Sequence, residues 1–267
     1  MRSEPRLTVG QAAALGLLHG PAELLPVSSS AHVGLVPFLL GWRYGELPPE
    51  VRKGFEVALH AGTLVGLARV VPPPPLRVAL PALLPAAVVG RLLERPIERR
   101  LGGVRATAVG LVAGAAAMVA ADRSASGRRR ATEATARDGW ALGVAQAVAL
   151  MPGLSRTGMT LAVARLRGFS RAEAATLSRQ VGLPVIAGAT ALKAVRLAQS
   201  GLERELRAPF AAGAVAALAG TLAAAPLRRV TSVWPAAVER VALAGAALIR
   251  LGGMRRGRRA GGRPSLR

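Results

Sequence analysis

Two polar stretches interrupt apolar sequence, and together they decide the fold that we expect. The first reads Glu23-Leu-Leu-Pro-Val-Ser-Ser-Ser-Ala-His32, and the second reads Met151-Pro-Gly-Leu-Ser-Arg-Thr-Gly-Met-Thr160. The first lies in an apolar run, Leu7–Trp42, whose only formal charge is Glu23. Burying a carboxylate in hydrocarbon costs several kcal/mol unless it has partners. Because Pro and Gly punctuate both stretches, they predict a buried polar site built by broken helices.

The composition predicts an all-α membrane protein. The 267 residues are 51% hydrophobic, with a mean hydropathy of +0.36. A full membrane span needs about 20 residues, and several of the apolar segments are shorter than this. Short apolar segments broken by Gly or Pro are typical of re-entrant helices. We therefore expect a polytopic membrane helical bundle that forms a single integral membrane domain over residues 1–267. Long windows without charge include Ala208–Leu227, Gly139–Ser155 and Ala106–Ala121.

The two halves of the chain look related. Pro26 and Pro152 lie 126 residues apart, and so do Gly62 and Gly188. A duplicated broken-helix unit is typical of inverted-repeat membrane folds, so we expect an inverted repeat with two re-entrant or broken helix pairs. The expected parts are pseudo-repeat halves at about 1–121 and 139–252, a basic connecting loop at 122–138 and a basic tail at 253–267. The positive-inside rule favours the cytoplasm for both basic segments, but a re-entrant pair between them would separate them. The orientation therefore stays open.

The charge of the chain points to a membrane rather than to nucleic acid. The net charge is +22, and only Lys53 and Lys193 among its 36 basic residues are lysines. Aromatic residues make up only 3% of the chain, and the arginines are scattered between apolar segments. This pattern indicates arginines at the level of lipid headgroups. The absence of cysteine from the sequence excludes disulfides and thiolate chemistry. The apolar N-terminal stretch runs directly into the first polar stretch, so we expect a membrane segment rather than a cleaved signal peptide.

Both polar stretches have the residues to hold a phosphate group. After Pro26, a helix can restart with a serine at its N-terminus, where free backbone N–H groups favour an anion. After Pro152, the same device is repeated, and Arg156 adds a cation that can bind phosphate bidentately. The hydroxyls in reach are those of Ser28, Ser29, Ser30, Ser155 and Thr157. Two ordinary helix breaks, with Arg156 reaching the membrane interface, are the alternative.

Glu23 and His32 add acid–base chemistry. Glu23 can orient a nucleophile, bind a divalent cation or act as a base, while His32 can transfer a proton. Glu56 and His60 have the i, i+4 spacing of a second such pair, although an ordinary hydrogen-bonded pair is the simpler interpretation. The sequence leaves the nucleophile open among Ser29, His32 and water.

The two stretches closely resemble the motifs of the undecaprenyl-diphosphate phosphatases, the bacitracin-resistance membrane phosphatases. The family's first motif is Glu-x-x-x-Glu followed by Leu-Pro-Val-Ser-Ser-x-x-His, and this chain matches it from His19 to His32. The second, Pro-Gly-x-Ser-Arg-Ser/Thr-Gly-x-Thr, is matched from Pro152 to Thr160. Two further segments also look like the family, Phe55–Leu64 and Leu183–Leu192.

The resemblance implies an enzyme that removes the terminal phosphate of undecaprenyl diphosphate, which recycles the lipid carrier of cell-wall synthesis and confers bacitracin resistance. It also implies a multi-pass protein of the cytoplasmic membrane and a divalent cation, Mg²⁺ or Ca²⁺; a homodimer is left open. We expect catalysis by Glu23, Ser29, His32 and Arg156. The expected substrate-binding residues are Ser28, Ser30, Ser155, Thr157, Thr160 and Arg179. The expected metal ligands are Glu23 and His19.

Two departures from the family pattern leave other functions open. His19 replaces the family's first acidic residue, and an imidazole there would weaken Mg²⁺ or Ca²⁺ binding and favour a softer ion. Arg179 lies where the family is usually apolar, so it either lines an entrance for the diphosphate or reaches the interface. A transporter or flippase of a phosphorylated lipid is one alternative. A weakened, non-catalytic relative that binds the lipid is another.

Overall fold

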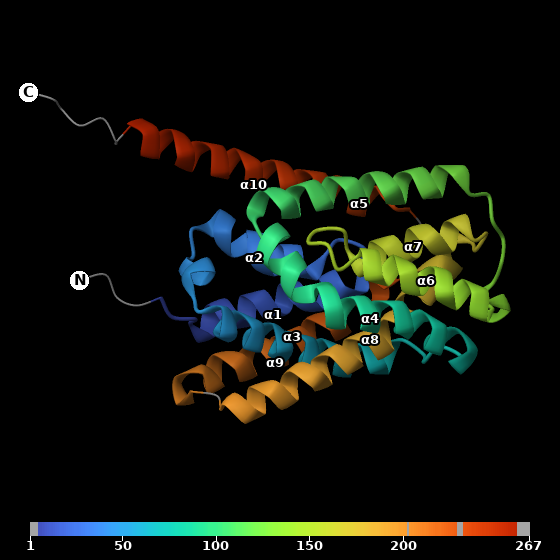
Figure 1. Cartoon of the computed structure of the whole chain (residues 1–267), viewed down its shortest axis with the longest axis horizontal. Helices are drawn as coiled ribbons and strands as arrows, with labels where there is room; N and C mark the ends of the chain where they lie inside the picture. The colour runs from blue at the N-terminus through green and yellow to red at the C-terminus, as the bar shows by residue number, and fades with distance from the viewer. Residues whose placement is uncertain (1–4, 202, 229–231, 261–267) are drawn as a thin grey trace, which may run out of the picture.

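The computed structural model describes residues 5–201, 203–228 and 232–260, and in these ranges it contains ten α-helices and no named strand (Figure 1). The predicted basic tail lies outside the described residues from position 261 on. The helices are α1 (Val9–Leu24), α2 (Ser29–Leu40), α3 (Pro49–Val70), α4 (Leu76–Leu101), α5 (Val104–Ser124), α6 (Ala136–Val148), α7 (Arg156–Leu166), α8 (Arg171–Ser200), α9 (Arg204–Ala223) and α10 (Trp234–Ala260). The 3-10 helices are η1 (Arg43–Glu46), η2 (Ala131–Glu133) and η3 (Ala225–Arg228).

Two hairpins of short helices form the centre of the molecule. Helices α1 and α2 have 16 and 12 residues, and α6 and α7 have 13 and 11, so each is too short to cross a membrane alone. The chain breaks after Leu24 and after Val148, where Pro26 and Pro152 cannot donate a helical hydrogen bond. Figure 1 shows the two hairpins entering from opposite ends of the molecule, with their tips together in the middle.

Longer helices surround these hairpins. Helices α4, α5, α8 and α9 are long and apolar enough to cross a membrane. Each half of the chain therefore has two short helices followed by three long ones, in the same order. The predicted helical membrane bundle is confirmed, and the internal repeat stays a prediction.

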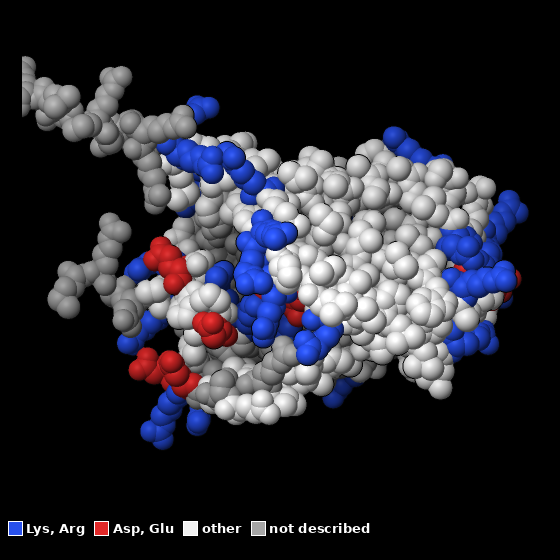
Figure 2. Space-filling view, in the orientation of Figure 1, with Lys and Arg blue, Asp and Glu red and all other residues white. Residues whose placement is uncertain are grey.

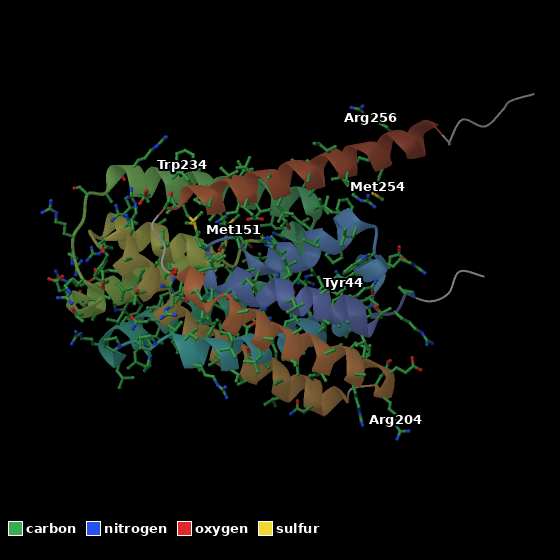
Figure 3. The ribbon with its side chains drawn as sticks, turned by 180° about the vertical axis from the view of Figure 1, so that it is seen from behind. Tyr44, Met151, Arg204, Trp234, Met254 and Arg256 are labelled. Atoms are coloured by element: carbon green, nitrogen blue, oxygen red, sulfur yellow. The ribbon has the colours of Figure 1, made fainter. Side chains whose placement is uncertain are left out.

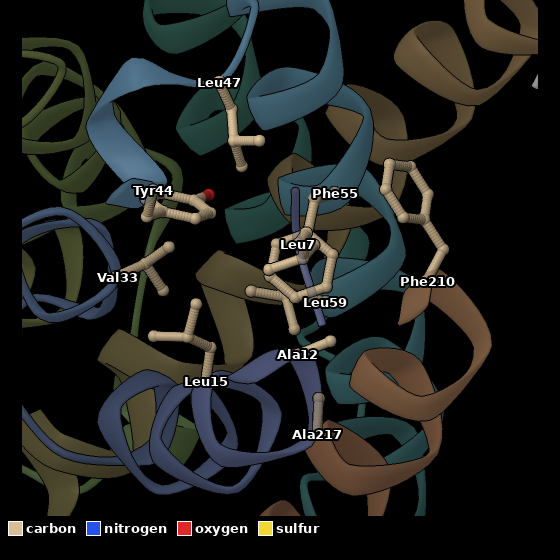
Figure 4. Packing of buried hydrophobic residues seen from close by; sticks show 10 residues of the cluster. All are labelled: Leu7, Ala12, Leu15, Val33, Tyr44, Leu47, Phe55, Leu59, Phe210 and Ala217. Atoms are coloured by element: carbon tan, nitrogen blue, oxygen red, sulfur yellow. The ribbon is translucent and has the colours of Figure 1, made fainter. Parts of the chain in front are cut away.

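Small residues and one aromatic cluster hold the helices around α9. A Cβ on Gly62 of α3 would lie 1.9 Å from the Ala214 carbonyl oxygen, and one on Gly16 of α1 would lie 2.3 Å from that of Gly213. Such glycines let membrane helices approach closely. At one end of this contact, Phe55 packs against Phe210, with ring centroids 5.5 Å apart (Figure 4). The first hairpin is thus fixed on one side by α9.

The connecting loop at 122–138 is anchored rather than free. Asp138 is fully buried, and its carboxylate accepts hydrogen bonds at 2.8 Å from both Arg129 Nη2 and Arg167 Nε. The loop lies at the opposite end of the molecule from the C-terminal end of α10 (Figure 1). A re-entrant α6–α7 pair explains this arrangement, because it returns the chain to its own side. The orientation of the chain in the membrane stays open.

The ion pair of Arg129 with Asp138 gives a stability prediction, and a neighbouring arginine provides the control. Arg129→Gln is expected to destabilise the protein by about 3 kcal/mol, because it removes one partner of a buried carboxylate. Arg128→Gln is the control, since Arg128 is exposed on the same loop. Thermal unfolding in detergent measures both changes. Equal unfolding midpoints for the two variants would show that the ion pair does not anchor the loop.

The anchor also predicts a pH dependence. Burial raises the pKa of the Asp138 carboxyl, but hydrogen bonds from Arg129, Thr135 and Arg167 outweigh it and hold the pKa below its ordinary value. The stabilisation is therefore complete above the unfolded pKa of about 4, and it is lost as the pH falls towards the lower folded pKa. The unfolding midpoints of wild type and Asp138→Asn are expected to differ by a constant amount from pH 8 to about pH 5. This difference should shrink as the pH falls below about 4. A difference that stays constant down to pH 3 would contradict this account.

Candidate active site

The tips of the two hairpins meet at Glu23, in the last turn of α1. One carboxylate oxygen, Oε1, accepts a hydrogen bond of 2.5 Å from the Ser29 hydroxyl. The other, Oε2, accepts one of 2.6 Å from Arg156 Nη2 at the start of α7. Glu23 is only 7% exposed. The structure thus brings a carboxylate, a hydroxyl and a guanidinium from two distant stretches into direct contact, as the sequence predicts.

Ser28 and Ser155 lie just before α2 and α7, and both have a positive φ, which is unfavourable for serine. Their φ angles are 78° and 63°, and among the described residues they are the only ones besides glycine with positive φ. Such a conformation costs about 1 kcal/mol or more and occurs mainly at functional sites. The Ser155 hydroxyl accepts a hydrogen bond from the Gly158 N–H, whereas Ser28 makes no such cap bond. The predicted serine cap is therefore absent at Ser28, and the first N–H groups of α2 can bind an anion.

One buried arginine that the sequence analysis missed fastens both tips. Arg240 of α10 is fully buried, and its Nη1 donates to the Pro26 carbonyl at 3.2 Å. Its Nη2 donates to the carbonyls of Gly153 and Leu154 at 2.8 and 2.9 Å. Figure 3 shows α10 from behind, with Met151 marking the second tip just below it. In the sequence, Arg240 directly precedes the apolar run Val241–Ile249, and a charge in that position indicates a residue that needs a partner.

His32 lies in α2 and does not contact Glu23. Its Nδ1 lies 2.8 Å from the Ser28 carbonyl and must carry a proton, since a carbonyl only accepts. Its Nε2 lies 2.9 Å from the Glu239 carboxylate of α10, a partner that the sequence analysis did not identify. His32 therefore holds the turn at Ser28 and shares a proton with Glu239.

His19 and His60 lie on the other side of Glu23. His60 Nε2 is 3.5 Å from Glu23 Oε1, and the two imidazole rings contact edge to face, with centroids 4.6 Å apart. His60 Nδ1 lies 2.8 Å from the backbone carbonyl of Glu56, so the expected pair at i, i+4 involves the main chain and not the carboxylate. His19 Nδ1 lies 2.9 Å from the Thr63 hydroxyl.

The remaining predicted binding residues lie at varying distances from this centre. The Thr157 hydroxyl is 3.5 Å from the Glu23 carbonyl oxygen, and Ser30 is exposed. Thr160 is fully buried, and its hydroxyl is bonded to the Arg156 carbonyl at 2.8 Å and to Ser178 at 2.6 Å. In the part of the chain that is described, no hydrogen bond joins Arg179 to Glu23 or Arg156. Thr160 thus supports the turn that carries Arg156, and a binding role for Arg179 and Ser30 stays a prediction.

A cavity of about 920 Å³ opens beside Arg156, between α4, α6 and α8. Its walls are largely apolar, and four further cations line it. These cations are Arg91, Arg95, Arg99 and Lys193. Figure 2 shows basic side chains gathered in a hollow over the middle of the molecule, where α4 passes. The cavity is thus both apolar and positively charged, and it ends at the guanidinium that contacts Glu23.

Space for Arg156 depends on a glycine in α8, which gives a prediction. A Cβ on Gly182 would lie 2.1 Å from Arg156 Nη1. Gly182→Ala is therefore expected to displace the guanidinium and to lower phosphate release by about 10²-fold, although alanine favours a helix. Gly245→Ala in α10 is the control, because no atom lies within 4 Å of its added Cβ. Similar phosphate release by both variants would show that Arg156 does not need this space.

Comparison with known proteins identifies the family. Residues 76–243 match the family described as bacitracin resistance protein BacA. The chain belongs to the BacA family. It is 36% identical to the undecaprenyl-diphosphatase of Geobacter sulfurreducens over an alignment of 219 residues that covers 73% of this chain and 79% of the relative. It is 35% identical to that of Thermomicrobium roseum over an alignment of 230 residues that covers 73% of this chain and 80% of the relative. The BacA match includes the second polar stretch and Arg240, and the predicted resemblance is confirmed.

Proposed function

We propose that this protein removes the terminal phosphate of undecaprenyl diphosphate and leaves undecaprenyl phosphate in the membrane. The contact of Ser29, Glu23 and Arg156 at the end of an apolar, basic cavity carries this proposal. The names of the relatives support it, since they describe diphosphatases of this lipid. The product is the lipid carrier of cell-wall synthesis, so the expected location is the cytoplasmic membrane and the expected phenotype is bacitracin resistance.

Ser29 is the nucleophile in this proposal, because its hydroxyl already donates to a carboxylate. Ser29 Oγ attacks the terminal phosphorus while the bond from that phosphorus to the bridging oxygen breaks, and Glu23 takes the hydroxyl proton. Undecaprenyl phosphate leaves with the bridging oxygen and takes the proton from Glu23, which is then a carboxylate again. Water then attacks the phosphoserine, its proton passes through Glu23 to Ser29 Oγ, and inorganic phosphate is released.

Arg156 has two partners in succession. Without substrate, its guanidinium neutralises Glu23 at 2.6 Å. A bound diphosphate competes for the same guanidinium, because arginine binds phosphate bidentately. Once Arg156 turns to the phosphate, Glu23 loses a positive neighbour and becomes a stronger base. The same movement places a fixed cation against the charge of the transferring phosphoryl group.

The cavity suits the two parts of the substrate. Its apolar walls between α4 and α8 match a polyprenyl chain, and its arginines match a diphosphate. Cations outnumber the one acidic residue of the lining, Glu94, and such an excess of positive charge raises the local concentration of an anion. The uncapped N–H groups at the start of α2 supply further donors for the phosphate oxygens.

The divalent cation that the resemblance implies does not fit this site well. Mg²⁺ and Ca²⁺ prefer oxygen ligands, usually several carboxylates and carbonyls. Near Glu23 the structure places two imidazoles and only one carboxylate, which is already paired with Arg156. The steps above are therefore derived from the side chains alone.

A trapping experiment tests the nucleophile. Wild-type protein mixed with undecaprenyl diphosphate labelled in its terminal phosphate, and quenched with acid, is expected to retain label on protein. Ser29→Ala should retain none, and Thr176→Ala, which removes a half-buried hydroxyl on α8 that donates to the Ala172 carbonyl, should behave as wild type. Phosphate release by Ser29→Ala at the wild-type rate would exclude Ser29 and leave water or His32 as the nucleophile. Transfer of the lipid across vesicles without any phosphate release would favour a transporter instead.

A further inference from the structure

We propose that His19, Glu23 and His60 form a site for a zinc-class divalent ion, in preference to Mg²⁺ and Ca²⁺. The inference deepens the proposed function, because Glu23 belongs to both. One ligand atom from each of the three residues lies within 4.8 Å of the other two. His19 and Glu23 come from α1 and His60 from α3, so two helices that pack together hold the set.

The clearest indication is a buried nitrogen without a partner. His19 is 1% exposed, and its Nε2 has no hydrogen-bond partner. Leaving a polar atom buried and unsatisfied costs about 1–3 kcal/mol, so such an atom calls for a partner, and a bound ion is one that would supply it. A cation held between His19 Nε2, His60 Nε2 and Glu23 would satisfy it.

Neighbouring groups fix both imidazoles in the form that binds metal. His60 Nδ1 faces the Glu56 carbonyl at 2.8 Å and therefore carries its proton there, which leaves a lone pair on Nε2 in the neutral ring. The Thr63 hydroxyl, 2.9 Å from His19 Nδ1, can accept in the same way. Metal-binding histidines almost always donate their other N–H to such a group. His60 Nε2 thus faces Glu23 at 3.5 Å, and Nε2 is the nitrogen of His19 that has no hydrogen-bond partner.

The donor set selects the ion. Two imidazoles and one carboxylate, with a further position open, form the usual set of a catalytic zinc site. Imidazole binds Zn²⁺ more strongly than Mn²⁺ or Fe²⁺, and Mg²⁺ and Ca²⁺ depend on anionic oxygens. Because Arg156 already neutralises part of the Glu23 charge, a hard ion gains little electrostatic stabilisation from this carboxylate. His19 and His60 together therefore change the kind of ion that this chain prefers.

The test measures binding directly and needs no substrate. The protein is purified without a histidine tag, stripped with a chelator, and titrated separately with ZnCl₂, MgCl₂ and CaCl₂ in calorimetry. Its only histidines are His19, His32 and His60, and it has no cysteine, so few other zinc sites compete. One equivalent of Zn²⁺ is expected per chain, at least about 100-fold tighter than Mg²⁺ or Ca²⁺.

Variants identify the ligands. His19→Ala and His60→Ala are each expected to weaken Zn²⁺ binding by more than about 100-fold, and Thr63→Val by about 10-fold. His32→Gln is the matched control and should keep wild-type binding. His19→Glu should narrow the gap between Zn²⁺ and Mg²⁺, since it restores a second carboxylate. With Co²⁺ in place of Zn²⁺, a visible absorption band should appear in wild type and be lost in His60→Ala.

Two results would overturn the inference. One is Zn²⁺ binding that survives in the His19→Ala, His60→Ala double variant, and the other is Mg²⁺ or Ca²⁺ binding as tight as that of Zn²⁺. Failure of the proposed function gives a different result from either of these. If the protein binds Zn²⁺ with these ligands but releases no phosphate, the zinc site stands and the phosphatase function is wrong. If it releases phosphate but does not bind Zn²⁺, the phosphatase function stands and the zinc site is wrong.

Discussion

Arg156→Ala is expected to lower kcat/KM for phosphate release from undecaprenyl diphosphate by about 10³-fold. Arginines that stabilise a transferring phosphoryl group are worth about 10³-fold or more, and removal of a single fixed donor costs about 10²–10³-fold. Arg156→Lys keeps the charge but loses the bidentate geometry, so we expect only partial recovery. A continuous phosphate assay on protein purified in detergent measures all three forms.

Two controls keep this prediction specific. Arg156→Ala leaves Glu23 without its guanidinium partner, so thermal unfolding must show that the variant is folded. Arg128→Gln removes an exposed arginine of the connecting loop that does not line the cavity, and it should keep full activity. Activity of folded Arg156→Ala within about threefold of wild type would mean that another group stabilises the phosphoryl charge.

Glu23→Gln is expected to lower kcat by about 10²–10⁴-fold, because the amide cannot take the proton of Ser29. Ser29→Ala removes the other end of the same 2.5 Å hydrogen bond and should be at least as severe. Since the two groups act in one step, the double variant should be scarcely slower than the slower single variant. Single-turnover rates of the three variants measure this coupling.

The rate of the double variant can also contradict this prediction. Losses that simply multiply would indicate that Glu23 and Ser29 act independently, as when Glu23 activates water and Ser29 only binds substrate. Zinc titration of Ser29→Ala should be unchanged, because Ser29 is not among the proposed ligands. This separates a defect in proton transfer from a defect in metal binding.

The sequence predicts the hairpins well because their causes are local. Pro26 and Pro152 each break a helix that is already too short to span, and proline acts through its own missing N–H. Glu23 could be assigned to a polar centre because a lone carboxylate in a long apolar run needs a partner. The matching spacing of the two stretches favours a site that both of them form, but the direct contact of Glu23 with Arg156, at 2.6 Å, appears only in the structure.

The supporting residues could not be predicted, because their roles depend on packing between distant helices. Arg240 lies more than 80 residues from the carbonyls of Gly153 and Leu154, and an arginine near a helix end is as easily explained by the membrane interface. Similarly, nothing local distinguishes His32, which faces Glu239, from His60, which faces Glu23. Only the arrangement of α1, α3 and α10 separates these roles.

The positive φ of Ser28 and Ser155 also depends on this packing. A serine does not adopt that conformation by preference, so the local sequence gives no sign of it. The turn at Ser28 is held by His32, and the carbonyls just before Ser155 are held by Arg240. The strain at the two tips is therefore maintained by contacts from α2 and α10.

The most direct measurement of the central claim is phosphate release from undecaprenyl diphosphate by the purified wild-type protein. It should be run after chelation and with added ZnCl₂, MgCl₂, CaCl₂ or MnCl₂. We predict multiple turnovers with inorganic phosphate and undecaprenyl phosphate in equal amounts, and a loss of this activity in Arg156→Ala and Glu23→Gln. No phosphate release by folded wild-type protein under any of these conditions would contradict the account.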